Sequence, residues 1–156
     1  MATWQHFTVA ASELAAFGTE RLAGKVAYLA TIRADGSPRV HPITPHIAQG
    51  CLFVYMDPAS PKAHDLQRDS RYALHCSVED TDGGAGEFSL RGQAQIIDDP
   101  NARAALFEAA KAAGFNPQAR YVLFELDIET ALATIYAGGE PTRKRWKADN
   151  DNSWRS

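Results

Sequence analysis

The triplet Ser60-Pro61-Lys62 combines three residue types that together suit an anion. Serine is a preferred N-cap residue and proline fits the first helical position, so a short helix is expected over residues 62–69. A helix N-terminus presents free backbone N–H groups and a partial positive charge, to which the Lys62 ammonium adds a full charge. The triplet therefore predicts either a phosphate-binding helix start or an ordinary capped helix with a solvated lysine.

Arg39 is a second candidate because it lies beside apolar residues in an extended segment. A half-buried guanidinium needs an anion, and its planar fork matches a phosphate. The alternative interpretation is an edge-strand arginine that faces water. His41 lies two residues further on, so it is expected on the same strand face as Arg39.

The segment Arg143-Lys144-Arg145-Trp146-Lys147 places four cations around one tryptophan. Such a segment could stack a planar ring on Trp146 and balance a negative charge with an arginine. Nucleic-acid binding and a solubilising surface strand are the alternatives. The net charge of −3 argues against a nucleic-acid partner.

Length and composition limit the class of protein. The chain has 156 residues, which predicts one domain, and its 45% apolar and 22% charged residues exclude a disordered chain, a collagen and a coiled coil. No apolar run approaches a membrane span of roughly 18 residues, and the N-terminus lacks a secretory-signal pattern. Cys51 and Cys76 lie in apolar segments, so we expect buried free thiols in a cytoplasmic protein. The histidines and cysteines lack zinc-ligand spacing, so no metal site is expected.

Hydrophobic patterning predicts a mainly β protein with inserted helices. Helices are expected at residues 9–22, 62–69 and from about Pro100 to Ala113. Strands are expected at residues 26–33, 39–47, 51–56, 72–78, 87–97 and 121–128, with a return strand at 132–136 and a bulge at Gly92. The first three would form a meander, with an Asp35-Gly36 turn after the first. Six or seven mostly antiparallel strands favour a closed or split barrel of Greek-key type, formed by residues 1–147 and followed by a polar tail at 148–156.

Three segments, taken in order, carry a family resemblance. They are TIRADGSPRVHPI (31–43), LFVYMDPASPKAHDL (52–66) and GEFSLRGQAQIIDD (86–99), with a weaker match at residues 142–147. Together they resemble the pyridoxamine 5′-phosphate oxidase-like family of FMN-binding split β-barrels. The resemblance implies that Arg39 and Lys62 bind the FMN phosphate with Ser60 at the helix cap. It also implies that Tyr55 and Met56 contact the phosphate and ring through the third strand.

Other implied contacts surround the flavin ring. Backbone groups of Val40, His41 and Pro42 would line the isoalloxazine edge. Glu87 falls where the oxidase has a glutamine near the pyrimidine end, and its negative charge would disfavour reduction of the flavin unless the carboxylate is protonated or paired.

The resemblance further implies a homodimer, because in this family two barrels pair and each flavin lies in the cleft between them. Trp146, with Arg143 or Arg145, would then come from the partner subunit. An arginine near the pyrimidine carbonyl would stabilise negative charge on the ring. His41 is the candidate catalytic proton donor.

The chain also departs from the vitamin B6 oxidase pattern. Pro61 replaces the arginine that usually precedes the phosphate lysine, and Thr44 replaces a substrate-binding lysine. The C-terminal Arg-x-His pair is absent as well. These departures argue against pyridoxine phosphate as the substrate.

Three functions therefore remain open. The first is an FMN-dependent oxidoreductase of a small planar substrate, in which the flavin carries the hydride chemistry. The second is a reductase of the same fold that uses the deazaflavin coenzyme, whose polyanionic glutamyl tail would suit the basic C-terminal segment. The third is a non-catalytic flavin- or haem-binding module, with His41, His46 or His75 as the possible axial ligand.

Overall fold

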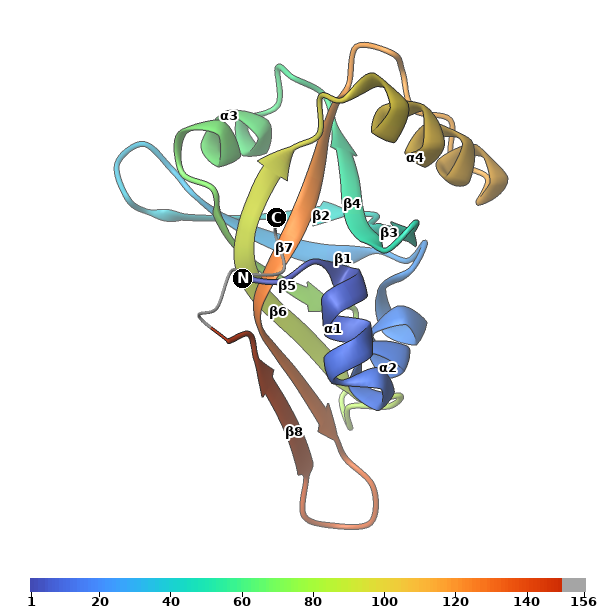
Figure 1. Cartoon of the computed structure of the whole chain (residues 1–156). Coiled ribbons are helices and arrows are strands. Elements are labelled where there is room, and N and C mark those ends of the chain that lie inside the picture. Colours follow the sequence, from blue (N-terminus) through green and yellow to red (C-terminus); the bar gives the residue numbers. More distant parts are fainter. Residues whose placement is uncertain (150–156) are drawn as a thin grey trace.

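The computed structural model describes residues 1–149, which form one curled antiparallel sheet with helices at its side and end (Figure 1). The helices are α1 (Trp4–Ala10), α2 (Ser12–Leu22), α3 (Pro61–Arg68) and α4 (Pro100–Ala112). The strands are β1 (Ala27–Ile32), β2 (Pro38–Ile43), β3 (His46–Ala48), β4 (Cys51–Met56), β5 (Arg71–Cys76), β6 (Glu87–Ile96), β7 (Val122–Ile135) and β8 (Thr142–Lys147). Among these residues no helix is long and apolar enough to cross a membrane.

The sheet runs in the order β2-β1-β5-β6-β7-β4-β3, and β8 adds to β7. Strands β2 and β3 lie at opposite ends of this path, yet only Thr44 and Pro45 separate them in the sequence. The sheet must therefore curl so that its two ends meet, which removes most of its exposed edge. This confirms the predicted mainly β split-barrel class.

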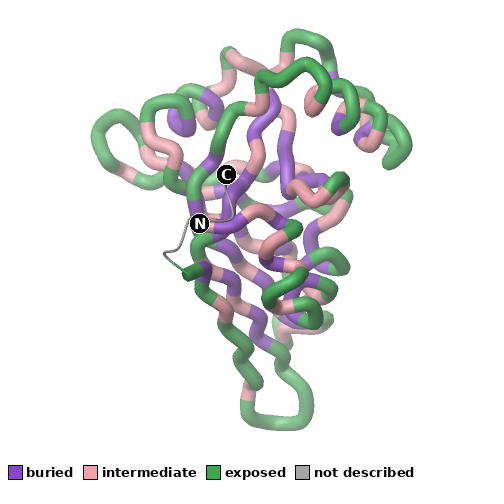
Figure 2. The backbone as a smooth tube through the Cα atoms, in the orientation of Figure 1, coloured by how far each residue is buried: buried purple, intermediate pink, exposed green. Residues whose placement is uncertain are grey.

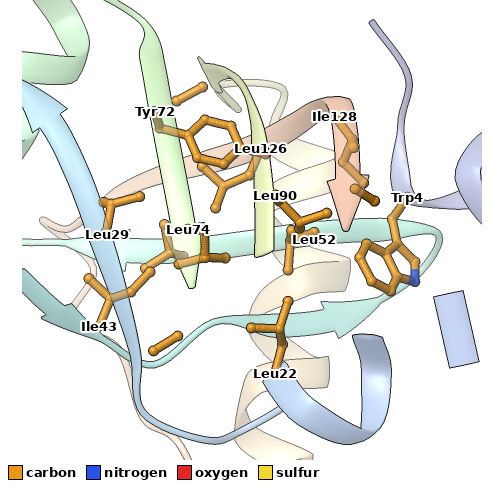
Figure 3. Packing of buried hydrophobic residues seen from close by; sticks show 14 of the residues in the cluster. Trp4, Leu22, Leu29, Ile43, Leu52, Tyr72, Leu74, Leu90, Leu126 and Ile128 are labelled. Carbon is orange, nitrogen blue, oxygen red and sulfur yellow. The ribbon is translucent and has the colours of Figure 1, made fainter. Parts of the chain in front are cut away.

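The core fills the inside of the curled sheet. Alternate strand residues such as Leu29, Leu74 and Leu90 point inward and are at most 1% exposed, as period-2 alternation requires (Figure 3). Trp4 and Leu22 extend the same cluster from α1 and α2. Full burial of each such leucine contributes about 1.5–3 kcal/mol, so the two N-terminal helices are held by packing.

A bulge at Gly92 lets β6 and β7 bend together. The pairing shifts between Arg91 and Gly92, which leaves Glu129 of β7 without an opposite residue. A Cβ atom at position 92 would lie 1.8 Å from the backbone oxygen of Asp127, so only glycine allows the two strands this close. The predicted bulge is confirmed.

The helix predicted over residues 9–22 is confirmed from Ser12 to Leu22, but residues 9 and 10 belong to a separate helix, α1, that the sequence did not predict. The chain forms two helices, the first capped by the Thr3 side chain, and Ala11 leaves helical geometry between them with φ −145°. The break turns both apolar faces onto the sheet, Trp4 and Phe7 from α1 and Leu14 from α2.

Two strand predictions also need correction. The segment 39–47 is split at Pro45 into β2, which pairs with β1, and β3, which pairs with β4. The predicted pairings between neighbours in sequence are therefore present, but the middle strand of the meander is two strands at opposite ends of the sheet order. The segments 121–128 and 132–136 are one 14-residue strand, β7, and the return strand is β8. The bulge at Glu129 breaks the inward–outward alternation, which hides this continuity in the sequence.

The β7–β8 hairpin projects past the body of the sheet, at the end away from α3 and α4 (Figure 1). Its tip is exposed, whereas its base joins the buried sheet (Figure 2). Ala148, just after β8, is 6% exposed, and its N–H donates to Glu129. The remainder of the predicted tail, residues 150–156, lies outside the described residues.

Candidate functional site

The N-terminus of α3 lies beside β2, and three basic side chains meet there. The charges of Lys62 and Arg39 both act on His41, and Arg39 of β2 contacts Asp65 of α3 directly. We call Arg39, His41, Lys62 and the first turn of α3 the cationic cradle. The sequence predicted each of these residues separately, and the structure brings them together.

Arg39 is anchored through one nitrogen only. Its Nε donates to the Asp65 carboxylate over 2.7 Å, and the same oxygen accepts from Thr31 Oγ1 over 2.8 Å. Arg68 donates to the other oxygen over 3.1 Å. The two terminal nitrogens of Arg39 have no partner among residues 1–149, so the fork can still bind an anion.

The first turn of α3 leaves one backbone donor open. Ser60 is the N-cap, and its hydroxyl accepts from Ala63 and donates to the Asp57 carbonyl. The N–H groups of Ala63 and His64 turn back to the Ser60 carbonyl, and Pro61 has none. Within the part of the chain that the structure describes, this leaves the N–H and ammonium of Lys62 for a ligand. Ser60 therefore shapes the helix start, while its hydroxyl is already engaged.

His41 is uncharged at neutral pH. Burial, followed by the positive charges of Lys62 and Arg39, lowers the pKa of this imidazole below its ordinary value. An uncharged imidazole between two cations can accept a proton or a hydrogen bond.

Strand β2 connects the cradle to the outer face of the sheet. Arg39 and His41 lie on one face and Val40 and Pro42 on the other, because side chains alternate along a strand. In the described chain β2 pairs only with β1, so its second backbone edge is free to bond a ligand.

The outer face of the sheet is hollowed into a groove of about 790 Å³. Two rows of paired residues line this groove. One is Val40, Ala30, Ala73, Arg91, Thr130 and Lys147, and the other is Tyr28, His75, Ser89, Leu132 and Arg145. The outer groove is therefore apolar at β1 and β2 and cationic at β6 and β8. Its volume falls within the range of roughly 300–1,000 Å³ that small-molecule sites occupy.

Trp146 stands at the cationic end of the outer groove but points inward. Its ring centroid lies 4.9 Å from that of Phe7 in the same chain. Arg145, one residue earlier, lines the groove, and Arg143 acts electrostatically on Tyr136.

Glu87 is paired on two sides. One carboxylate oxygen lies 3.4 Å from Nε2 of His75, and the other accepts a short hydrogen bond from the Tyr136 hydroxyl. Contacts with the Cys76 side chain, then its backbone carbonyl, together with the Glu87 carboxylate raise the pKa of His75 to about 9 against the opposing effect of burial. The charge of Glu87 is therefore balanced within the chain.

Two sequence candidates lie elsewhere. The Met56 side chain is 2% exposed inside the barrel core. The Tyr55 ring packs near Phe53 and Phe115, and its buried hydroxyl has no partner among the described residues. Because Met56 is buried and the Tyr55 ring packs on the second core cluster, any flavin contact from these two residues would come from the backbone of β4.

A family model described as pyridoxamine 5′-phosphate oxidase matches residues 15–141, more than half of the chain. The chain belongs to the pyridoxamine 5′-phosphate oxidase family. A search of curated protein sequences gave no match.

Solved structures with this fold carry names that indicate diverse functions. A pyridoxamine 5′-phosphate oxidase-related, FMN-binding protein from Nostoc punctiforme superposes with a TM-score of 0.68 at 16% identity, covering 92% of this chain and 91% of that one. A structure named F420 reductase gives 0.56 at 19% identity, covering 72% and 94%. The haem storage protein HutZ from Vibrio cholerae gives 0.57 at 21% identity, covering 76% and 89%. At these identities the likeness shows the fold alone.

For a family that includes FMN-binding members, the residues of this chain suit a phosphorylated flavin. The cradle offers the Arg39 fork and the Lys62 ammonium to a phosphate, and the outer groove offers apolar surface to a ring. Among the described residues no group of three His, Cys, Asp or Glu side chains could hold a metal ion.

Sequence reasoning missed Asp65 and the surroundings of His75. Asp65 lies between the buried residues Ala63 and Leu66 of α3. A carboxylate on the buried face of an amphipathic helix needs a cation as its partner. The position of Asp65 among apolar residues was therefore a sequence signal that could have identified it. Nothing local in the sequence links His75 to Glu87, because their contact depends on the β5–β6 pairing.

Proposed function

We propose that this chain is an FMN-dependent oxidoreductase that acts as a homodimer on a small planar substrate. The observation that carries the proposal is the continuity between the cationic cradle and the outer groove through β2. Arg39 and His41 belong to the cradle, and Val40, which lies between them on the opposite face of β2, lines the groove. A phosphorylated flavin that follows β2 would meet charge at one end and apolar surface at the other.

In this proposal the protein binds and orients the cofactor. Arg39 and Lys62 hold the phosphate, and the free edge of β2 bonds the polar edge of the ring. When bound, the flavin supplies the redox chemistry by taking up or giving up a hydride. Arg145 or Arg143 stabilises negative charge on the ring. His41 starts uncharged, so it accepts a proton before it can donate one.

The apolar end of the outer groove supports the homodimer. Tyr28 is 46% exposed and Val40 is 64% exposed on the same face. Exposed apolar surface of this kind commonly marks an interaction site. A second copy placed over the groove would cover both residues and bring its own β8 toward the flavin.

A deazaflavin-dependent reductase of the same fold is the second candidate. Three cations, Arg91, Arg145 and Lys147, form one end of the groove, where they could balance several negative charges on one ligand. A polyanionic tail such as the glutamyl tail of that coenzyme would suit this end.

The haem-binding alternative gains little support from the histidines. The His46 ring is 6% exposed and lies near the rings of Phe53 and Phe115, with centroids 5.5 and 5.1 Å away. His75 uses Nδ1 on the Cys76 carbonyl and Nε2 on Glu87. Nε2 of His46 has no partner among the described residues but is buried, so of the three only His41 combines an open nitrogen with partial exposure.

The test is the visible absorption spectrum of freshly purified protein, followed by titration of FMN and of the deazaflavin coenzyme into the apo form. A flavin spectrum, or FMN binding near one per chain, supports the proposal. Binding of the deazaflavin coenzyme alone supports the second candidate, and a Soret band supports the haem module. The proposal is contradicted if the purified protein carries no chromophore and the apo form binds neither coenzyme.

A further inference from the structure

A buried carboxylate lies beside the cationic cradle, where its charge opposes that of a bound phosphate. The Asp65 side chain is 4% exposed, and it accepts hydrogen bonds from Arg39, Thr31 and Arg68. Burial alone would raise the pKa of Asp65, but these three hydrogen bonds hold it below its ordinary value. The group is therefore charged at neutral pH and acts on any anion in the cradle.

Stability alone gives a poor account of this charge. Desolvation of a buried ion pair offsets much of its attraction, so such pairs are weak contributors to folding. The geometry suggests a different role, because Asp65 engages only Nε of Arg39. A guanidinium is planar and rigid, so fixing Nε also fixes the direction of the two terminal nitrogens.

We propose that Asp65 is a positioning residue that directs the Arg39 fork at the phosphate, so that the site selects a phosphorylated flavin over an unphosphorylated one. This inference rests on the proposed FMN-binding function. Thr31 assists by donating to the same Asp65 oxygen from β1, the strand that pairs with β2. A fork that is already oriented loses less side-chain entropy when it binds.

The sign of one measurement separates positioning from simple electrostatics. Replacing Asp65 by asparagine removes a negative charge near the phosphate, which alone would strengthen phosphate binding. If Asp65 positions Arg39, the same substitution weakens phosphate binding despite the favourable change in charge. A purely structural defect would weaken the binding of both flavins equally.

The experiment compares FMN with riboflavin, which lacks the phosphate, by flavin fluorescence titration of the apo protein. In Asp65→Asn we expect the FMN-to-riboflavin affinity ratio to fall by about tenfold, roughly the loss of one charge-assisted hydrogen bond. Riboflavin affinity itself should stay within about twofold of wild type, because riboflavin makes no phosphate contact. An unchanged or higher ratio overturns the inference.

Two further variants keep the test decisive if Asp65→Asn folds poorly. Arg39→Lys keeps the charge but replaces the fork by one ammonium, which cannot bridge Asp65 and a phosphate with fixed geometry. It should lose selectivity as Asp65→Asn does, and full selectivity in Arg39→Lys would contradict the inference. Arg71→Gln is the control, since it removes an exposed cation that pairs with Asp69 and not with Asp65, and it should leave the ratio unchanged.

The outcomes also distinguish this inference from the proposed function. Wild-type protein that binds neither flavin overturns both. Wild-type protein that prefers FMN, together with an Asp65→Asn variant that keeps this preference, overturns only the role of Asp65.

Discussion

The Glu87 carboxylate lies 3.4 Å from Nε2 of His75, and the two side chains come from neighbouring strands of the sheet. The family resemblance implies that Glu87 falls where the oxidase has a neutral glutamine, and an unpaired negative charge there would oppose reduction of a nearby flavin. His75 supplies the opposing charge, because its raised pKa of about 9 keeps the imidazole protonated at neutral pH. The pair therefore presents little net charge.

Contacts with Cys76 are the larger cause of the raised pKa of His75, about 9, and the Glu87 carboxylate adds to it, so Glu87→Gln should lower this pKa in part. The Cys76 contacts remain, so the pKa should stay above its ordinary value. The measurement is an NMR titration of the His75 ring. The stabilisation from charged His75 is present below about pH 6.5 and is lost as pH rises through about 9, so Glu87→Gln should flatten this alkaline loss.

Tyr136→Phe is the control for this pair. It removes the hydroxyl that donates to Glu87 but keeps the carboxylate next to His75. The pKa of His75 should therefore stay raised. An identical His75 titration in wild type and Glu87→Gln would show that Glu87 has no effect on this imidazole.

Lys62→Ala should weaken FMN binding by about 1.5–3 kcal/mol, the contribution of one charge-assisted hydrogen bond. Riboflavin binding should change little, because Lys62 belongs to the cradle and not to the outer groove. Fluorescence titration of both flavins measures this. Lys111→Ala, on the surface of α4, is the matched control and should leave both affinities unchanged. FMN affinity that is unaltered in Lys62→Ala would remove Lys62 from the phosphate site.

Local signals in the sequence sufficed for the parts of the fold that depend on neighbouring residues. Ser60 and Pro61 fix the start of α3, because capping and the fixed φ of proline act within one turn. Asp35 and Gly36 mark the β1–β2 turn, and Gly92 marks the bulge. These signals placed Arg39 and Lys62 on the correct elements.

Long-range pairing was the part that the sequence could not supply. Arg39 and Asp65 are 26 positions apart, and their contact requires α3 to pack beside β1 and β2. The bulge at Glu129 likewise disguised β7 as two strands, because it reverses which residues face the core. The flavin contacts implied by family resemblance remain predictions, including those of Tyr55 and Met56, whose side chains pack in the two core clusters.

Val40→Asp should convert a wild-type dimer into a monomer. The substitution places a charge on the apolar end of the outer groove, where burial against a second copy would leave that charge unpaired. Light scattering during size exclusion at micromolar concentration measures the mass. Val9→Asp is the matched control, since Val9 is 76% exposed on α1 and should leave the dimer intact. A monomeric wild type would contradict a flavin site completed by a second copy.

Gly92→Ala should lower the free energy of unfolding by more than about 3 kcal/mol, which is exceptional for one added methyl group. The new Cβ would meet the Asp127 carbonyl, and backbone cannot move aside as a side chain can. Urea denaturation measures the loss. Gly24→Ala is the comparison, because Gly24 has φ +67° with open space around it and should cost only about 1–2 kcal/mol. Equal losses in the two variants would contradict a close contact between position 92 of β6 and the Asp127 carbonyl of β7.

His46 should make the fold less stable in mild acid. Burial lowers the pKa of His46 below its ordinary 6.5, so the unfolded chain takes up a proton in a pH range where the folded chain does not. The resulting stability is present above about pH 6.5 and is lost as pH falls through the folded pKa. His46→Phe should remove this loss, since phenylalanine can occupy the site between Phe53 and Phe115.

Thermal unfolding from about pH 7.5 to about pH 5 tests this, a range that brackets the titration of an unperturbed histidine. The melting temperature of His46→Phe should exceed that of wild type by a margin that widens as pH falls. His64→Gln, an exposed change on α3, should follow the wild-type profile. Parallel profiles for wild type and His46→Phe would mean that the imidazole at position 46 takes up its proton equally in the folded and unfolded chain, in contradiction to its burial between two aromatic rings.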